Sequence, residues 1–313
     1  MKETESKRDL LSIDDFDDEL AQIIDWGIRI KNDDGFADAF KPLDGMSIGS
    51  IYEKPSTRTR VSFEVGISKL GGQPLTLLAN DIQLGKSESI ADTAAVLSRF
   101  MDGITYRCFG HPDVRELAKH ATVPVINALS DKHHPCQAAA DLMTIKEKKG
   151  RIEGLQLVYV GDGNNVAHSL GLGGALAGLN VRFICPKGFQ PKPDIIETAQ
   201  EVAARRGATI EVTDDLGAVA GADMVYTDVW ASMGQEKQAL ARAEAFAGYT
   251  VNQQLMAKAK EDAIFMHCLP AHREEEVSTE VLEGPQSVVI DEAENRLHAQ
   301  KALMVYLVNK SNE

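Results

Sequence analysis

The sequence is short of the features that mark secreted and membrane-bound proteins. No apolar run approaches the roughly 20 residues that a membrane-spanning helix needs. The N-terminal segment also lacks the apolar core and cleavage site of a secretory signal. The cysteines show no paired spacing that would indicate a disulfide framework; they are Cys108, Cys136, Cys185 and Cys268. We therefore expect a cytoplasmic protein with reduced thiols and no membrane partner.

Positive charge is scarce as well. The chain has 33 basic against 47 acidic residues and a formal net charge of -14, which disfavours nucleic-acid binding. One stretch departs from this balance: "EKPSTRTRVSFEVG", residues 53–66, gathers Lys54, Arg58 and Arg60 among hydroxyl groups. A local concentration of cations in an acidic chain indicates an anionic ligand.

Strand-like and helical segments alternate along the 313 residues, and the pattern restarts with stronger strands after Gly154. This alternation predicts an α/β protein of two lobes, each with a mostly parallel sheet flanked by helices, and an active site in the cleft between them. We place the domains at residues 1–145 and 146–294. Residues 287–310 are expected to form a strand, a polar turn and an amphipathic helix, and the terminal helix, about 295–313, is expected to pack back on the first domain.

The basic stretch has the composition of a phosphate site. A helix beginning near Ser56 directs its unsatisfied N–H groups and positive dipole end at a ligand in front of it. Hydroxyls and a guanidinium suited to phosphate come from Ser56, Thr57, Thr59 and Arg58. Because neighbours two apart diverge on a helix, we expect one arginine to bind the ligand and the other to pair with a carboxylate such as Glu64. The alternative is an ordinary capped helix with solvated arginines.

Further polar residues follow other predicted strands. Arg107 ends one strand, His134 and Gln137 lie in "HHPCQ", Asp228 lies in "TDVWASMG", and Cys268 lies in "MHCLPAHR". Neighbouring His133 and His134 with Cys136 suggest zinc, but adjacent histidines point apart and no second ligand cluster has usable spacing, so no metal is predicted.

The turn "GDGNN" resembles the start of a dinucleotide-binding loop without completing it. Gly161 and Gly163 are followed by Val166 where the G-x-G-x-x-G pattern requires glycine. The asparagine side chains suit a polar small molecule better than a pyrophosphate. We therefore predict no nicotinamide cofactor.

Taken together, "STRTR", "HPCQ", "DGNN", "DVWASMG", "HCLPAHR" and "DEAENRLHAQKA" resemble the ornithine branch of the aspartate/ornithine carbamoyltransferase family. The resemblance extends from about Gly45 to the terminal helix. "STRTR" and "HPxQ" are shared across carbamoyltransferases, whereas "SMG" and "HCLP" point to ornithine. It implies transfer of the carbamoyl group of carbamoyl phosphate to ornithine, giving citrulline and phosphate, with a place in arginine biosynthesis and no cofactor.

The resemblance also assigns residues to the two substrates. It implies catalytic roles for Cys268, Arg107 and His134, and ornithine contacts from Asn165, Asp228, Ser232 and Met233. The implied carbamoyl-phosphate residues are Ser56, Thr57, Arg58, Thr59, Gln83, Arg107, His134, Pro135, Cys136, Gln137, Cys268, Leu269 and Arg296. Members of the family form trimers, so we expect a homotrimer in which Gln83 completes the site of a neighbouring subunit.

The substrate and the chemistry are not fully fixed by these residues. A sister transferase would use putrescine or an acylated ornithine, although the Asp228 carboxylate has no α-amino group to bind in putrescine. A nicotinamide-dependent dehydrogenase and a non-catalytic amino-acid-binding regulator also stay open. The proton of the attacking amine could pass to Cys268 or to the departing phosphate.

Overall fold

The computed structural model describes residues 7–85, 87–231 and 239–310, and the chain divides into two compact units. Unit 1 comprises Met1–Met143 and Glu294–Glu313, and unit 2 comprises Thr144–Ala293. The chain passes from one unit to the other within helix α6 (Pro135–Lys149) and returns within helix α12 (Val289–Lys310). No described helix is long and apolar enough to cross a membrane.

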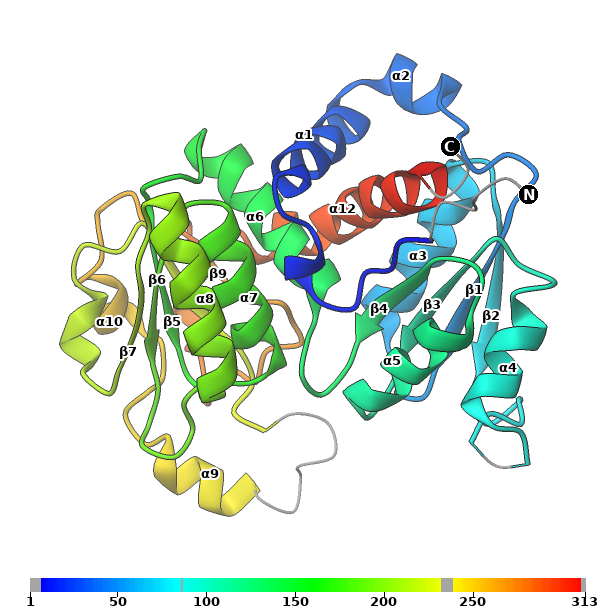
Figure 1. Cartoon of the computed structure of the whole chain (residues 1–313). Helices are drawn as coiled ribbons and strands as arrows, with labels where there is room; N and C mark the ends of the chain where they lie inside the picture. The colour runs from blue at the N-terminus through cyan, green and yellow to red at the C-terminus, as the bar shows by residue number, and fades with distance from the viewer. Residues whose placement is uncertain (1–6, 86, 232–238, 311–313) are drawn as a thin grey trace. The chain divides into compact units, whose positions relative to one another are not determined.

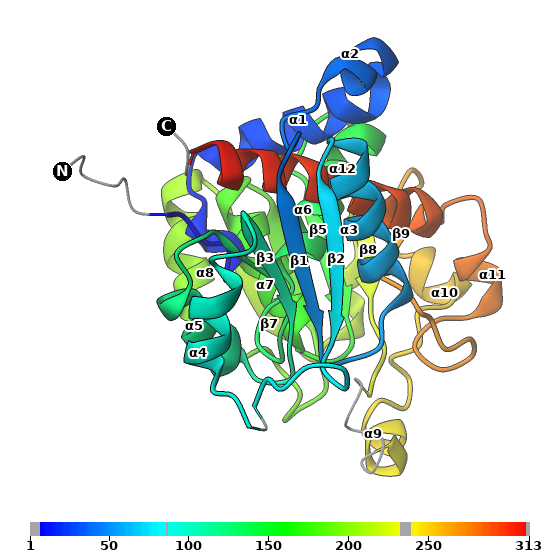
Figure 2. The same cartoon turned by 90° about the vertical axis from the view of Figure 1, so that its right-hand side faces the viewer.

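Unit 1 is built on a parallel sheet with strand order β2-β1-β3-β4 (Figure 1). The strands are β1 (Ser47–Tyr52), β2 (Gln73–Leu78), β3 (Gly103–Arg107) and β4 (Val125–Leu129). Helices α4 (Ile90–Leu97) and α5 (His111–His120) pack their apolar side chains on one face, where Ile104 and Tyr106 meet Val114 and Leu117. Helix α3 (Thr57–Lys69) and the C-terminal part of α12 cover the other face (Figure 2).

The N-terminal segment adds to the edge of this sheet. Leu10 bridges Ile126 in parallel, and it is followed by the short helix η1 (Ile13–Asp15) and by α1 (Glu19–Asn32) and α2 (Asp34–Ala39). Its backbone N–H and C=O groups therefore satisfy the outer edge of β4.

Unit 2 holds a second parallel sheet, with strand order β7-β6-β5-β8-β9. Its strands are β5 (Gln156–Val160), β6 (Asn180–Ile184), β7 (Ile210–Thr213), β8 (Met224–Thr227) and β9 (Ile264–Met266). Helices α7 (Asn165–Leu176) and α8 (Pro193–Arg206) pack on one face (Figure 1). The other face is covered by η2 (Leu216–Val219), α10 (Gln253–Met256) and α11 (Thr279–Leu282), while α9 (Ala239–Ala245) follows β8. The predicted fold class, parallel sheets flanked by helices in two units, is confirmed.

The predicted strand and polar turn before the terminal helix are wrong. Only a single bridge forms there, between Phe265 and Ser287, and α12 runs unbroken from Val289. The polar residues taken for a turn are part of this helix; they are Glu292, Asn295 and Arg296. Their side chains are buried, and each forms hydrogen bonds with residues of its own unit. The sequence alone does not distinguish polar residues that are buried with hydrogen-bond partners from polar residues in an exposed turn.

Candidate active site

The basic turn caps helix α3, as the sequence predicts. Ser56 has an extended backbone, and its Oγ accepts a hydrogen bond from the Thr59 N–H at 3.2 Å. The other N–H groups of the first turn have no carbonyl partner within the helix and lie at the positive end of its 13 residues. Arg60 Nε lies 2.9 Å from Glu64 Oε1, which confirms that one arginine of the pair has a carboxylate partner. The half-buried Arg58 is left as the candidate ligand-binding arginine.

Three strand ends of unit 1 bring other predicted residues to the same edge. Strands β1, β3 and β4 are adjacent and parallel, so their carboxyl ends lie together. Arg107 ends β3, and His134 lies in the loop between β4 and α6. Both side chains are buried, with 5% and 4% exposure. Polar groups in such a position are expected to serve a ligand.

Arg296 joins this edge from helix α12. Its Nη1 donates to Gln137 Oε1 at 2.6 Å, and its Nη2 donates to Thr59 Oγ1 at 3.1 Å. Gln137 in turn donates from Nε2 to Asp141 Oδ1 at 2.8 Å. The amide of Gln137 therefore has a fixed orientation, and Arg296 ties the start of α3 to the start of α6.

We call Arg58, Arg107, His134 and Arg296 the cationic cluster, although His134 itself is neutral. Burial holds the pKa of His134 well below its usual range, and the positive charges of Arg296, Arg107 and Arg58 lower it further. A neutral imidazole beside guanidinium groups can form hydrogen bonds without adding charge. The cluster thus offers fixed positive charge to a phosphoryl group and a neutral polar group to its neighbour.

The other unit 1 candidates differ in their surroundings. Gln83 lies on the exposed loop after β2, where its Oε1 accepts from Ser87 Oγ at 2.9 Å. Pro135 begins α6 and is buried. The buried Cys136 thiol is directed at the Asn127 carbonyl at 3.6 Å, and burial raises its pKa to about 12. A Cys136 thiol of this kind is inert, so a substrate contact from this residue would have to come from its backbone.

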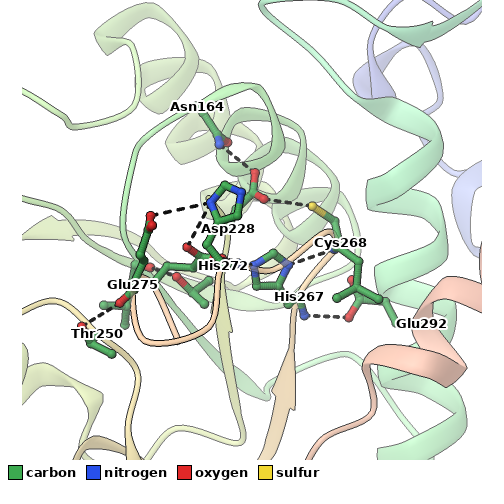
Figure 3. Close-up of polar contacts among 12 residues, drawn as sticks. Asn164, Asp228, Thr250, His267, Cys268, His272, Glu275 and Glu292 are labelled. Atoms are coloured by element: carbon green, nitrogen blue, oxygen red, sulfur yellow. Dashed lines mark hydrogen bonds and ion pairs between the residues drawn. The ribbon is translucent and has the colours of Figure 1, made fainter. Parts of the chain in front are cut away.

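In unit 2 the candidate residues converge on Asp228, which follows β8 and is buried (Figure 3). Asn164 Nδ2 donates to Asp228 Oδ2 at 2.8 Å, and Cys268 Sγ donates to Asp228 Oδ1 at 3.1 Å. Three segments that are far apart in the sequence, after β5, β8 and β9, therefore meet at one carboxylate. That arrangement suits an ammonium group.

Asn164 was not predicted as a site residue. Its Oδ1 accepts from the N–H groups of Val166 and Ala167 as the N-cap of α7, while its amide donates to Asp228. The predicted Asn165 is half-buried in the first turn of the same helix. The preference of asparagine for N-caps could have identified Asn164 as the structural member of the pair. Ser232 and Met233 lie outside the described residues.

A buried hydrogen-bond network lies behind Cys268, and no sequence motif indicates it. Leu269 N–H donates to His267 Nδ1 at 2.9 Å, and His267 Nε2 lies 3.2 Å from Glu276 Oε1. The backbone N–H of His267 donates to Glu292 Oε2 at 2.9 Å (Figure 3). Glu292 Oε1 also accepts from the Tyr226 hydroxyl at 3.1 Å. His267 thereby fixes Leu269, whose φ of 57° lies in the left-handed region.

Asp228, His267 and Cys268 also bring potential metal-ligand atoms within 4.8 Å of one another. The Cys268 thiol and the His267 ring are already engaged with Asp228, Leu269 and Glu276. The arrangement is thus accounted for by hydrogen bonds, and a metal-free site stays a prediction.

Comparisons with known proteins agree with this geometry. A family model for the carbamoyl-P binding domain of aspartate/ornithine carbamoyltransferases matches residues 8–147, and a model for their Asp/Orn binding domain matches residues 153–307. The chain belongs to the aspartate/ornithine carbamoyltransferase family. The predicted family membership and carbamoyltransferase activity are confirmed.

Individual relatives resemble the chain over nearly its whole length. An ornithine carbamoyltransferase of Symbiobacterium thermophilum is 56% identical, with 96% of this chain and 98% of the relative covered. The solved structure of ornithine carbamoyltransferase from Pyrococcus furiosus has a TM-score of 0.92 and 51% identity, covering 96% of each chain. An acetylornithine transcarbamylase structure, complexed with acetylcitrulline, has a TM-score of 0.85 and 29% identity, covering 96% of this chain and 99% of that one.

Proposed function

We propose that the protein transfers the carbamoyl group of carbamoyl phosphate to the side-chain amine of L-ornithine, giving L-citrulline and phosphate, with the cationic cluster and Asp228 binding the two substrates. The observation that carries this proposal is the contrast between three guanidinium groups around a neutral His134 in unit 1 and a buried carboxylate with fixed donors in unit 2. A phosphate and an ammonium are the complementary ligands.

Carbamoyl phosphate is bound by the N-terminus of α3 and the cationic cluster. The hydroxyls of Ser56, Thr57 and Thr59, the first-turn N–H groups and Arg58 hold the phosphate. Arg107 and the neutral His134 lie at the carbamoyl group, with Gln137 and Arg296 completing that side. Pro135 and Cys136 contribute backbone only. The Arg296–Gln137 contact of 2.6 Å supports this assignment because it holds both groups at the start of α6.

Ornithine is bound in unit 2 with its α-amino group on Asp228. Asn165, Ser232 and Met233 contact the rest of the amino acid, while Cys268 and Leu269 lie beside the side-chain amine. The buried position of Asp228 supports this role, since an ammonium partner offsets the cost of burying a carboxylate.

The reaction follows from these charges. The amine of ornithine, once deprotonated, attacks the carbamoyl carbon, and Arg107 and His134 stabilise the developing oxyanion; one such donor contributes about 2.7–4 kcal/mol. The Cys268 thiol already donates its proton to Asp228, so it orients the amine and does not accept a proton from it. The departing phosphate takes the amine proton, and the C–O bond to phosphate breaks as citrulline forms.

A panel of amines tests this proposal. The protein is incubated with carbamoyl phosphate and with L-ornithine, putrescine or Nα-acetyl-L-ornithine, and both phosphate and the carbamoylated product are measured. We expect citrulline with ornithine and little turnover with the other amines. Preferred turnover of the acetylated amine would favour the sister reaction, and phosphate release without a carbamoylated product would contradict the proposal. The nicotinamide-dependent alternative requires a change in cofactor absorbance, which we do not expect.

Gln83 and the assembly form a separate part of the proposal: a homotrimer, in the cytoplasm, in which Gln83 acts in the site of a neighbouring subunit. The exposed position of Gln83 supports this role. So does a group of exposed apolar side chains on α3 and on the edge strand β2, which is typical of an interaction surface; these are Val61, Val65, Leu75 and Leu78.

Mixed assemblies test the position of Gln83. Gln83→Ala and Cys268→Ala subunits, each inactive alone, are dissociated, mixed and reassembled. If Gln83 acts in a neighbour, random reassortment in a closed ring restores about a quarter of the sites. No recovery in assemblies shown to contain both subunits would mean that Gln83 acts within its own chain.

A further inference from the structure

A buried ion pair in unit 2 lies outside the residues assigned to either substrate. Arg242 Nη1, on helix α9, lies 2.9 Å from Asp162 Oδ2 and 2.6 Å from the Trp230 carbonyl oxygen, to which it donates. Its guanidinium also lies over the Phe189 ring, 5.0 Å from the centroid. Arg242 and Asp162 are 8% and 6% exposed. The pair is therefore not an ordinary solvent-exposed ion pair. Burying two charged side chains costs desolvation free energy, which suggests that the pair has a specific role.

The partners of Arg242 lie on the two turns that carry the ornithine residues. Asp162 follows β5 and stands two residues before Asn164, while Trp230 follows β8 and stands two residues after Asp228. Strands β5 and β8 are hydrogen-bonded neighbours, and the Asn164–Asp228 contact of 2.8 Å joins the same two turns. Arg242 therefore joins the two turns a second time, through Asp162 and Trp230.

Both turns are also held by packing. The Trp230 ring stacks on Phe246 with centroids 5.4 Å apart. A Cβ at Gly163 would come 2.1 Å from the Pro191 backbone nitrogen, so the turn after β5 lies directly against the segment that follows Phe189. Side chains confined in this way leave few alternative positions for Asp162 and Trp230.

The charges give the pair a second role. Asp162 and Asp228 are both buried, and Asp228 disfavours ionisation of Asp162. Arg242 neutralises Asp162 through the ion pair, which leaves the charge of Asp228 available for a substrate ammonium. Without Arg242, the charge of Asp162 would lie uncompensated beside a second buried carboxylate.

We infer that Arg242 is a positioning residue for ornithine: by bonding Asp162 and the Trp230 carbonyl, it fixes Asp228 and Asn164 in place and offsets the negative charge of Asp162 beside Asp228. The inference rests on the proposed role of Asp228 and adds a residue that does not itself contact substrate.

The ion pair makes amino-acid binding depend on pH. Burial raises the pKa of Asp162 to about 6, against the lowering effect of Arg242, and Asp228 raises it further. The other ionisable groups that face Asp162 are the Tyr159 hydroxyl and the Cys185 thiol, both of which stay protonated because their pKa values are raised. As the pH falls through about 6, Asp162 takes up a proton and the ion pair is lost. Affinity for the amino acid should fall in the same range.

The test compares Arg242→Gln with Arg182→Gln. Arg182, on strand β6 of the same sheet, is the control because it also bonds a carboxylate, Glu211 at 2.6 Å, and a backbone carbonyl, Ala218 at 2.8 Å. The KM for each substrate and kcat are measured, together with inhibition by L-norvaline, an amino acid that has no side-chain amine. We expect Arg242→Gln to raise the ornithine KM and the norvaline Ki by about 10- to 100-fold, since small misplacements in a site have effects of this size. The KM for carbamoyl phosphate and the control should stay near wild type, and Arg242→Lys should recover part of the loss.

The pH profile provides a readout that does not depend on the folding of an Arg242 variant. In the wild type the norvaline Ki should rise as the pH falls through about 6, and in Asp162→Asn it should be raised at every pH without that step. Wild-type ornithine KM in a folded Arg242→Gln protein, equal losses for both substrates, or a flat wild-type profile would each overturn the inference. Absence of citrulline formation by the wild type would instead refute the proposed function.

Discussion

The candidate site residues of the two units are built on groups of opposite charge. In unit 1 burial and three arginines lower the pKa of His134, whereas in unit 2 burial and a neighbouring carboxylate raise the pKa of Asp162. The unit 1 groups centre on guanidinium side chains, and the unit 2 groups centre on buried carboxylates. Under the proposed function, the complementary ligands are a phosphate in unit 1 and an ammonium in unit 2.

The largest effect is expected when a positive charge is removed from the candidate site of unit 1. Arg58→Ala removes a charged donor from the α3 turn and should lower kcat/KM for carbamoyl phosphate by about 100- to 1,000-fold. Arg60→Ala is the matched control, because Arg60 pairs with Glu64 on the exposed side of the same turn and such pairs contribute about 0–1 kcal/mol. Steady-state kinetics and thermal melting of both variants check the prediction; equal losses in the two would contradict it.

The sequence predicts those features of the two sites that depend on residues close together along the chain. The cap by Ser56 and the pairing of Arg60 with Glu64 follow from helix geometry, and the residues at strand ends follow from a parallel sheet. Contacts between distant segments could not be predicted. Arg242 and Asp162 are joined only by the fold, and the polar residues of early α12 resemble a turn because their buried partners lie elsewhere in the sequence.

The reverse pattern, a loss for ornithine with little change for carbamoyl phosphate, is expected when Asp228 loses its charge. Asp228→Asn removes the counter-charge of an ammonium and should raise the ornithine KM by about 10- to 100-fold, because hydrogen bonds to charged groups contribute about 1.5–3 kcal/mol. The KM for carbamoyl phosphate should change little. Separate titration of each substrate checks this, and a parallel loss for both would assign Asp228 to the fold.

A smaller effect is expected from Lys54, a buried lysine of unit 1. Lys54 lies beside Arg107 with its ammonium 4.7 Å from the Phe109 ring centroid, and its pKa is lowered by burial and by Arg107. Lys54→Met should raise the KM for carbamoyl phosphate by about two- to fivefold, the scale of a charge acting through partly hydrated protein. It should not lower the melting temperature, because a lysine with a lowered pKa disfavours the folded state at neutral pH.

Lys301→Met is the matched control for Lys54→Met. Burial and the charges of Lys69 and Lys41 lower the pKa of Lys301 to about 8, but nothing connects it to the cationic cluster among the described contacts. Between about 8 and its ordinary value of 10.5 the unfolded chain holds more protons at this residue, so wild-type stability should rise with pH in that range. Lys301→Met should remove the rise and leave both KM values unchanged; denaturant unfolding across that range checks it.

The central claim is that each charge cluster serves its own substrate, and one calorimetric comparison tests it most directly. The probe is phosphonoacetamide, the analogue of carbamoyl phosphate in which a methylene replaces the bridging oxygen, titrated into wild type, Arg58→Ala and Asp228→Asn. We predict that Arg58→Ala raises the Kd at least about tenfold, the loss of one charge-assisted hydrogen bond, and that Asp228→Asn leaves it near the wild-type value. An unchanged Kd in Arg58→Ala, or an equal rise in both variants, would contradict it.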